Sequence, residues 1–132
     1  MPKTTLKHEI IVHALTSRLW SILTSSSFTR QFLFSDELIS EWTEGSAVRS
    51  AVDGSHHGQV TEVKPGMMLR FILQLDFSPA PVGFQYELEP ADRGTRLKLL
   101  QEVDSIEKGS LKAVEEHGWL MLQKIKWLAE YS

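Results

Sequence analysis

The stretch that decides the fold stands near the end of the chain, at residues 110–131, and reads SLKAVEEHGWLMLQKIKWLAEY. Its apolar positions recur every three to four residues, which is the spacing of one face of an α-helix. The members of this inward stripe are Leu111, Val114, Gly118, Met121, Leu122, Ile125, Leu128 and Ala129. At 1.5 Å per residue the predicted helix is roughly 30 Å long, so it can cross a whole sheet.

The same helix also carries apolar residues on its opposite side. Leu120, Trp127 and Tyr131 are spaced by seven and four residues, so we expect them to form an outward stripe. An exposed stripe of this kind is typical of a contact surface, and a homodimer or another partner could use it.

Gly118 costs the helix about 1 kcal/mol relative to alanine, which indicates a close approach or a space beside it.

The region before this helix, from Trp42 to about Glu102, alternates apolar and polar residues like strands joined by short turns. The turns are predicted at Asp53-Gly54, Pro65-Gly66 and Arg93-Gly94. At Asp53-Gly54 we expect positive φ at both residues, as the favoured hairpin turn requires. Because the connections are short, successive strands should be antiparallel neighbours.

The N-terminal part adds one more strand and two short helices. Leu6, His8, Ile10 and Val12 alternate as one face of a strand, and Thr16 is the predicted N-cap of the first helix. Phe28 and Phe32, four residues apart, predict the second helix. The predicted order is therefore β-α-α-β-β-β-β-β-α. This is an α+β domain over residues 1–132, with an antiparallel sheet of about six strands and the helices segregated to one of its faces.

The composition limits the classes of function. Of the 132 residues 42% are hydrophobic and 23% charged, which is typical of one globular domain. There is no cysteine, so disulfides, thiol catalysis and cysteine-based metal sites are excluded. A net charge of −3 does not favour nucleic acid or anionic lipid. Without a predicted signal or membrane-spanning segment, we expect a soluble cytoplasmic protein.

Signals for catalysis or metal binding are weak. None of the serines stands in a Gly-x-Ser-x-Gly elbow. Asp53, His56 and His57 carry groups that suit a metal, but neighbouring residues on a strand point to opposite faces, so His56 and His57 cannot easily share one ion. A polar hairpin tip explains them more simply. We predict no catalytic residue, no metal site and no cofactor.

Two polar residues are candidates for contact with a ligand. His8 has the inward register of its strand, so it is either a core histidine with a satisfied hydrogen bond or a cavity group. Glu115 flanks the inward stripe of the long helix, as a solvated residue or as a second polar cavity group. If both faced one cavity, acid–base chemistry would become conceivable.

The aromatic residues of the strands suit the wall of a cavity for an apolar ligand. Phe71, Phe84 and Tyr86 have the registers expected to face the helix, and the Tyr86 hydroxyl is a polar anchor. The alternative is a core filled by side chains. The full set of predicted ligand-binding residues is His8, Trp42, Phe71, Phe84, Tyr86, Glu115, Gly118, Met121, Leu122 and Ile125.

Six short motifs occur in an order that is familiar from one superfamily. They are ALTSRLWSILT at 14–24, EWTEGS at 41–46, GQVTEVKP at 58–65, GTRL at 94–97, HGW at 117–119 and IKWLAE at 125–130. With these motifs the chain resembles the helix-grip (START-related, birch-pollen-allergen-like) superfamily, and in particular small bacterial members of the heat-shock-protein ATPase activator-like family. Two places depart from the family pattern and could change the cavity mouth: the run 32–34 (FLF), and His56-His57 before the third motif.

The resemblance implies the helix-grip fold, in which a curved antiparallel sheet of about six strands is wrapped around the long C-terminal helix, with a cavity between the two. The superfamily includes lipid carriers, aromatic polyketide cyclases, hormone receptors and co-chaperone domains, so the fold alone does not give the function. We expect a soluble protein that binds a small apolar or amphipathic molecule without transforming it. The alternatives are a chaperone-associated interaction domain, and a cyclase- or hydrolase-type enzyme that uses the same cavity.

Overall fold

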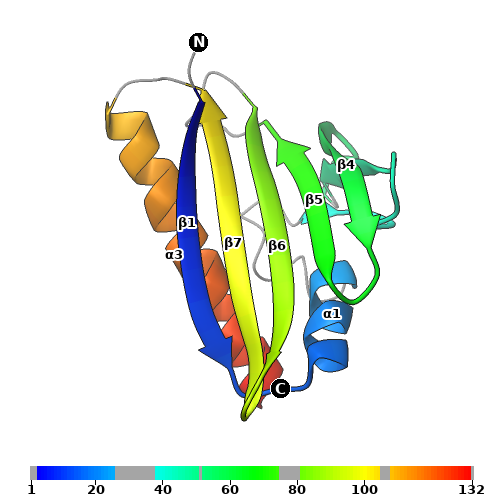
Figure 1. The fold of residues 1–132 in the computed structure, drawn as a ribbon. Helices are drawn as coiled ribbons and strands as arrows, with labels where there is room; N and C mark the ends of the chain where they lie inside the picture. Colours follow the sequence, from blue (N-terminus) through cyan, green and yellow to red (C-terminus); the bar gives the residue numbers. More distant parts are fainter. Residues whose placement is uncertain (1–2, 26–37, 51, 75–80, 105–107, 132) are drawn as a thin grey trace.

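The structure is a computed structural model that describes residues 3–25, 38–50, 52–74, 81–104 and 108–131. These residues form a curved sheet and two helices (Figure 1). In chain order the elements are β1 (Lys3–Val12), α1 (Thr16–Thr24), β2 (Leu38–Ile39), β3 (Ala47–Ser50), β4 (His56–Lys64), β5 (Met68–Leu73), β6 (Val82–Ala91), β7 (Gly94–Asp104) and α3 (Lys108–Tyr131).

All the described strands join one antiparallel sheet in the order β1-β7-β6-β5-β4-β3-β2. From β2 to β7 each strand pairs with its successor, and β1 then pairs with β7 over its whole length. The sheet has seven strands, one more than expected, because Leu38 and Ile39 pair with Ser50 and Arg49 as the short strand β2. The helix predicted around Phe28 and Phe32 lies outside the described residues.

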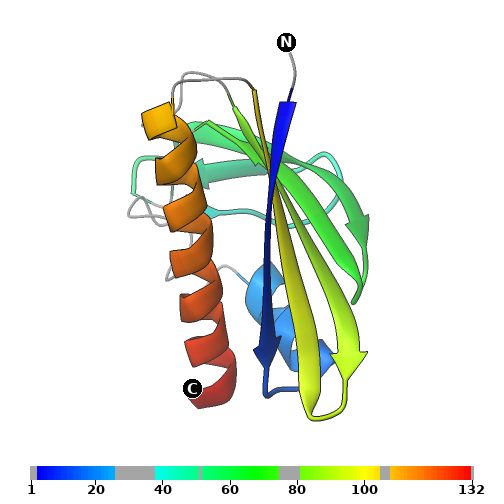
Figure 2. The same cartoon turned by 60° about the vertical axis from the view of Figure 1, so that its left-hand side comes forward.

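Both helices cover the same face of the sheet. In Figure 2 the long helix α3 stands along the concave side, with α1 lower down on that side. Helix α3 contacts β1 and β7, whereas α1 contacts α3, β6 and β7. The inward stripe of α3 is confirmed, since Val114, Met121, Leu122 and Ile125 are all buried in the hydrophobic core. Neither described helix is long and apolar enough to span a membrane.

The turn predicted at Pro65-Gly66 is present: Gly66 has φ +78° and the Met67 N–H donates to the Lys64 carbonyl at 2.9 Å. The turn predicted at Arg93-Gly94 is present one residue earlier. Ala91 pairs with Gly94, so Asp92 and Arg93 are its central residues and Gly94 begins β7.

The prediction for the Asp53-Gly54 turn is wrong in detail. Gly54 has φ +73°, but Asp53 does not have positive φ. The loop is longer than a two-residue turn, because the Gly54 N–H donates to the Ser50 carbonyl and the Ser50 N–H donates to the Ser55 carbonyl, each at 2.9 Å. In this loop the Asp53 side chain accepts a hydrogen bond from the Ser55 N–H at 2.9 Å, which needs no positive φ at Asp53.

The predicted N-cap at Thr16 is also wrong. Helix α1 begins at Thr16, and its N-cap residue is Leu15, which has no side chain able to cap the helix. The Thr16 hydroxyl instead lies 3.0 Å from the hydroxyl of Thr95, which donates to the Ala14 carbonyl at 2.9 Å. Thr16 therefore connects α1 to β7 rather than capping its own helix.

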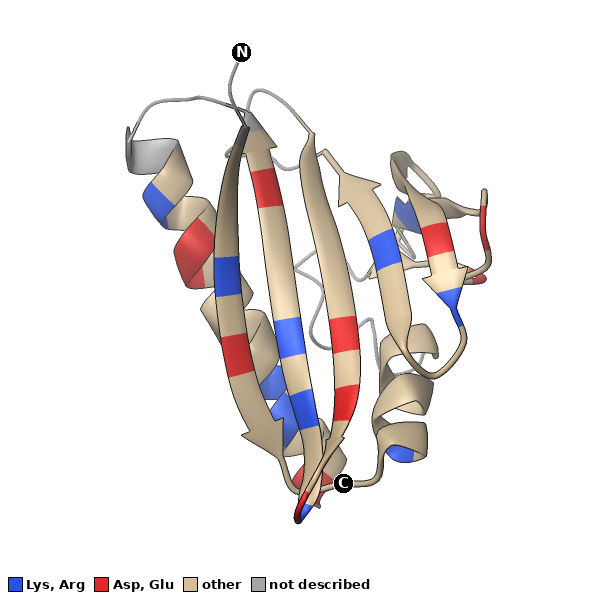
Figure 3. Ribbon diagram, in the orientation of Figure 1, with Lys and Arg blue, Asp and Glu red and all other residues tan. Residues whose placement is uncertain are grey.

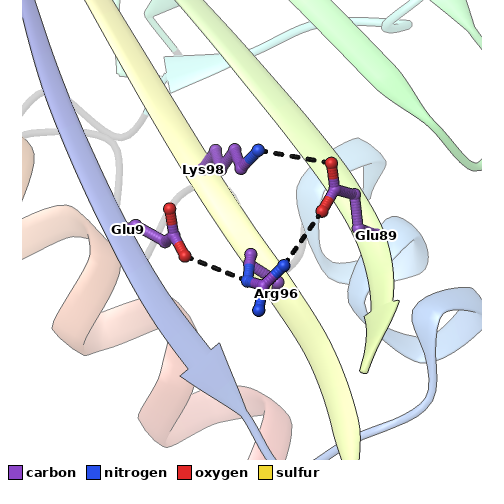
Figure 4. Close-up of polar contacts among 4 residues, drawn as sticks. All are labelled: Glu9, Glu89, Arg96 and Lys98. Atoms are coloured by element: carbon purple, nitrogen blue, oxygen red, sulfur yellow. Dashed lines mark hydrogen bonds and ion pairs between the residues drawn. The ribbon is translucent and has the colours of Figure 1, made fainter. Parts of the chain in front are cut away.

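Charged residues of both signs lie along the strands of the sheet (Figure 3). In β6 and β7 they alternate with buried residues, so they face away from the helices. Four of them form a ladder across three strands (Figure 4): Arg96 contacts Glu9 at 2.9 Å and Glu89 at 3.3 Å, and Lys98 contacts Glu89 at 3.2 Å. Hydrogen bonding and charge from Lys98, followed by Arg96, lower the pKa of Glu89. Because these side chains are largely exposed, water screens the pairs and they add little to stability. This face suits contact with water.

The C-terminal end of α3 is held by polar contacts from the β1–α1 corner. Arg18 donates to the carbonyls of Ala129 and Leu128 at 3.2 and 3.3 Å, which places a positive charge at the negative end of the helix dipole. The Lys126 ammonium donates to the Ile11 carbonyl at 2.7 Å, and Glu130 accepts from the His13 N–H at 2.7 Å. These contacts fix the helix end over the sheet.

Candidate ligand-binding site

Four aromatic residues meet in the interior, on the face of the sheet that the helices cover. Phe71 of β5 pairs with Phe84 of β6, and their rings stack with centroids 5.2 Å apart. Trp42, between β2 and β3, meets Phe71 edge-on at 5.5 Å, and the Tyr86 ring lies 5.8 Å from Phe71. All four are buried, as the alternating registers predicted for the strand residues. We call them the aromatic cluster.

Two polar atoms of the aromatic cluster are buried without a partner. Within the described part of the chain, neither the Trp42 indole nitrogen Nε1 nor the Tyr86 hydroxyl makes a hydrogen bond. The residues themselves are only 3% and 1% exposed. Burial raises the pKa of Tyr86 far above its ordinary value, so the hydroxyl keeps its proton and remains a donor. Since most buried polar atoms in proteins are paired, two in one cluster require an explanation.

The backbone at Trp42 is strained. Among the described residues, Trp42 is the non-glycine residue with positive φ, at +54°. Such a conformation costs on the order of 1–3 kcal/mol and persists only where its surroundings impose it. Here the Trp42 N–H donates to the Ser40 hydroxyl at 3.0 Å, and that hydroxyl lies 3.1 Å from the hydroxyl of Ser46. The two serines thus fix the chain where the indole enters the core.

Helix α3 supplies the facing apolar side chains of the same core. Met121, Leu122 and Ile125, all predicted to face a ligand, are buried in one hydrophobic cluster with the aromatic residues. Their burial agrees with the helical spacing. Their contact with a ligand stays a prediction.

His8 takes part in a polar connection from β1 through β7 to α3. Its Nε2 lies 2.9 Å from the side-chain oxygen of Gln101, and the Gln101 amide donates to the Val114 carbonyl at 3.1 Å. Because the Gln101 amide nitrogen is used by Val114, its oxygen must accept from His8, so His8 Nε2 carries a proton. The inward register predicted for His8 agrees with this contact, which satisfies one of its ring nitrogens.

Gln101, which is fully buried and connects His8 to α3, was not predicted from the sequence. A signal was present, since Gln101 follows Leu97 and Leu99 in the inward register of β7. It also explains Gly118, because a Cβ atom there would overlap the Gln101 side chain. The close approach that a mid-helix glycine indicated is therefore an approach to Gln101.

His8 also lies at a surface hollow of about 420 Å³ beside the edge strand β1. Glu115, Glu116 and Trp119 line it from α3, and the Trp119 ring stacks on His8 with centroids 5.7 Å apart. His8 and Glu115 thus share one hollow, but the residues of the aromatic cluster do not line it. The predicted site residues therefore fall into two groups, the buried cluster and this edge.

A second hollow of about 480 Å³ lies where β2 and β3 meet. It is lined by Ile39, Ser40, Glu41, Ser46, Ala47 and Arg49. Ser40 and Ser46, which hold the backbone of Trp42, are among these residues. Ser40 and Ser46 therefore line this hollow and, through their hydroxyls, also hold the strained backbone of Trp42.

The outward stripe of α3 is exposed as the helical spacing predicted. Leu120, Trp127 and Tyr131 are 55%, 59% and 72% exposed, and the Trp127 and Tyr131 rings lie 6.3 Å apart. This places three exposed apolar residues on the solvent side of the helix, two of them in contact. Its use as an interface stays a prediction.

The hairpin tip between β3 and β4 carries polar contacts of its own. Ser55 lies 3.1 Å from Nε2 of the half-buried His57, and its hydrogen bonds lower the pKa of the exposed Asp53. In the part of the chain that the structure describes, no group of three His, Cys, Asp or Glu side chains is placed to hold a metal ion.

The family follows from a comparison with known sequences. A family model described as "Activator of Hsp90 ATPase homolog 1-like protein" matches residues 13–130. The chain belongs to this family. No curated protein matches it.

Solved structures show where the family's fold recurs. The Aha1 dimer from Colwellia psychrerythraea has 14% identity and a TM-score of 0.79, with 97% of each chain covered. Protein MLL2253 from Mesorhizobium loti has 18% identity and a TM-score of 0.75, covering 95% of this chain and 96% of that one. DynU16, a protein in the dynemicin biosynthetic locus, has 16% identity and a TM-score of 0.80, covering 98% of this chain and 48% of that one. The expected helix-grip fold is confirmed.

Proposed function

We propose that this protein binds a small apolar or amphipathic molecule between the sheet and α3. The observation that carries the proposal is the aromatic cluster, with two buried donors that have no partner among the described residues. Ligand sites are mostly apolar with a few polar groups that fix orientation, and the cluster has this composition. The fold is also shared with DynU16 of a biosynthetic locus, which is consistent with a role in handling such molecules.

The test is a search for bound molecules. Native mass spectrometry of the freshly purified protein, followed by a thermal-shift panel of lipids and aromatic polyketides, should give a retained or stabilising molecule. A ligand present at a hundred times its Kd stabilises the folded state by about 2.7 kcal/mol, which a thermal shift detects readily. If nothing is retained and no panel member raises the Tm, the proposal is refuted.

The family description supports a second candidate, a chaperone-associated interaction domain. The chain would then bind a heat-shock ATPase and raise its turnover. A pull-down with the purified chaperone and an ATPase assay test this directly. Absence of both binding and stimulation removes this candidate.

The shared hollow of His8 and Glu115 supports the third candidate, a hydrolase- or cyclase-type enzyme. A histidine and a carboxylate at one hollow could provide a base and an acid. Turnover of p-nitrophenyl esters that is lost in both His8→Ala and Glu115→Gln would support it. Turnover that neither variant changes would exclude these residues.

We also propose that the outward stripe of α3 binds a second copy of the chain. The support is its exposed Leu120, Trp127 and Tyr131, together with a family-fold neighbour from Colwellia psychrerythraea that was solved as a dimer. Exposed aromatic and aliphatic residues on one helix face are typical of homodimer contacts.

A further inference from the structure

We propose that Trp42 and Tyr86 bind an uncharged hydrogen-bond acceptor of the ligand: a ketone, quinone or ester carbonyl within an aromatic or apolar skeleton. This inference rests on the proposed function, because it requires that a molecule enters the core. It adds the chemical class of the polar group and the two residues that recognise it.

The first step of the argument is the type of the two unpaired groups. An indole nitrogen can only donate a hydrogen bond, and a protonated phenol can also donate one. Trp42 and Tyr86 both lie against Phe71, at ring distances of 5.5 and 5.8 Å. A carbonyl oxygen has two lone pairs, so it is an acceptor that suits either donor.

The second step is the absence of a compensating charge. Among the described residues, the buried polar side chains outside the aromatic ones are Ser50, Thr95 and Gln101, which are all neutral. A carboxylate in this core would therefore lack a buried cation, and burying an unpaired charge is far more costly than burying a hydrogen-bonded carbonyl. The raised pKa of Tyr86 has the same cause, because burial disfavours a negative charge at this position. The surroundings select an uncharged acceptor.

The third step is the fixed position of Trp42. Its positive φ is held by Ser40, and its ring is set edge-on to Phe71 at an interplanar angle of 71°. Strained residues cluster at ligand-binding positions, where the surrounding structure holds a side chain ready for binding. A donor fixed in this way loses little conformational freedom when the acceptor arrives.

Matched probes test the inference. Fluorenone and fluorene share one aromatic skeleton and differ by the carbonyl, and fluorenone carboxylate adds a negative charge. By calorimetry we expect fluorenone to bind at least about tenfold more tightly than fluorene, as one or two gained hydrogen bonds imply. Fluorenone carboxylate should bind more weakly than fluorenone.

Two variants assign the preference to the named residues. Tyr86→Phe and Trp42→Phe each remove one donor, and each should reduce the preference for fluorenone over fluorene. Trp127→Phe, at an exposed position of α3, is the matched control and should leave the preference unchanged. Because Tyr86→Phe removes only an unpaired hydroxyl, the variant should remain folded and keep its affinity for fluorene.

The outcomes separate this inference from the proposed function. Equal affinity for fluorenone and fluorene overturns the inference alone. If another panel molecule binds but fluorenone and fluorene do not, the inference alone is again overturned. Failure of every panel molecule to bind overturns the proposed function and the inference with it. A preference for fluorenone that survives in both donor variants overturns the assignment of Trp42 and Tyr86.

Discussion

The hydroxyl of Tyr86 is a small group with a measurable consequence for stability. It is buried in the aromatic cluster and has no partner among the described residues, so folding removes it from water without compensation. We predict that Tyr86→Phe raises the free energy of unfolding of the ligand-free protein by about 1 kcal/mol. Urea denaturation monitored by circular dichroism measures this. The control is Tyr131→Phe at an exposed position, which should change stability little. A clear loss of stability in Tyr86→Phe would mean that the hydroxyl has a partner.

For single residues, the direction of a side chain could be predicted from the sequence, but its hydrogen-bond partners could not. The alternation in β1 was enough to place His8 inward, and helical spacing was enough to place Gly118 against the sheet. Both His8 and Gly118 lie against the side chain of Gln101, which is 93 positions from His8 in the chain. Alternation shows which face a side chain takes but not what faces it across the core, so neither the hydrogen bond nor the role of Gly118 could be predicted.

At the scale of elements, Gly118 and Gln101 determine how closely α3 approaches β7. A methyl group at position 118 would overlap the Gln101 side chain, which is held by His8 and the Val114 carbonyl and cannot swing away freely. We predict that Gly118→Ala destabilises the protein by roughly 1–2 kcal/mol, because overpacking outweighs the gain in helix propensity.

A double-mutant cycle checks this explanation. In a Gln101→Ala background the clash is gone, so Gly118→Ala should stabilise the protein by up to about 1 kcal/mol through helix propensity alone. Denaturant unfolding of the four proteins gives the coupling energy. The same destabilisation in both backgrounds would show that Gln101 is not the reason for the glycine.

The C-terminal turn of α3 should make stability depend on pH. Burial opposes the charge on Glu130, but the His13 N–H and the Lys126 ammonium outweigh it, so its pKa lies below the ordinary 4.5. A lowered pKa in the folded state means that this contribution is fully present above about pH 4.5 and is lost as the pH falls through the folded pKa. We predict that Glu130→Gln lowers the Tm modestly at neutral pH.

The pH dependence supplies the check. The difference in Tm between the wild type and Glu130→Gln should shrink as the pH falls below 4.5. Thermal melts from neutral to acidic pH measure this difference. A difference that is constant over the whole range would show that the carboxylate charge is not involved.

Long periodic elements were predictable, and short or tertiary features were not. Helix α3 has enough turns for its inward stripe to be unambiguous, whereas the two residues of β2 are too few to show any alternation. Thr16 is a favoured N-cap type, but its hydroxyl contacts Thr95 on another element, so tertiary structure overrode the local preference.

At the scale of the whole molecule, the outward stripe of α3 predicts a dimer that one charge should break. Trp127→Glu places a carboxylate in the middle of this stripe, and burying it against a second copy is unfavourable. We predict a dimer for the wild type and a monomer for Trp127→Glu by light scattering. Met67→Glu, at another exposed apolar position, is the control and should remain dimeric. If both the wild type and Trp127→Glu are monomers, the outward stripe of α3 is not a dimer interface.

The order of the long strands and the C-terminal helix could be predicted because it follows from the spacing of apolar residues and from the order of the turns, and the resemblance to the helix-grip superfamily implied how they pack. The candidate site could be predicted only in part. The sequence put Phe71, Phe84 and Tyr86 on the face toward the helix, but hydrogen-bond partners are set by contacts distant in the chain. The unpaired donors of Trp42 and Tyr86 therefore became visible only in three dimensions.

The central claim is that the carbonyl of an apolar aromatic molecule binds at the aromatic cluster, and the indole N–H of Trp42 reports on it most directly. The chain has four tryptophans, whose indole signals can be resolved in a nitrogen–proton correlation spectrum and assigned with Trp→Phe variants. On titration with fluorenone, the Trp42 signal should move downfield and saturate as its hydrogen bond forms, while that of the exposed Trp127 stays in place. A Trp42 signal that does not respond, or shifts confined to the exposed Trp119 and Trp127, would contradict the account.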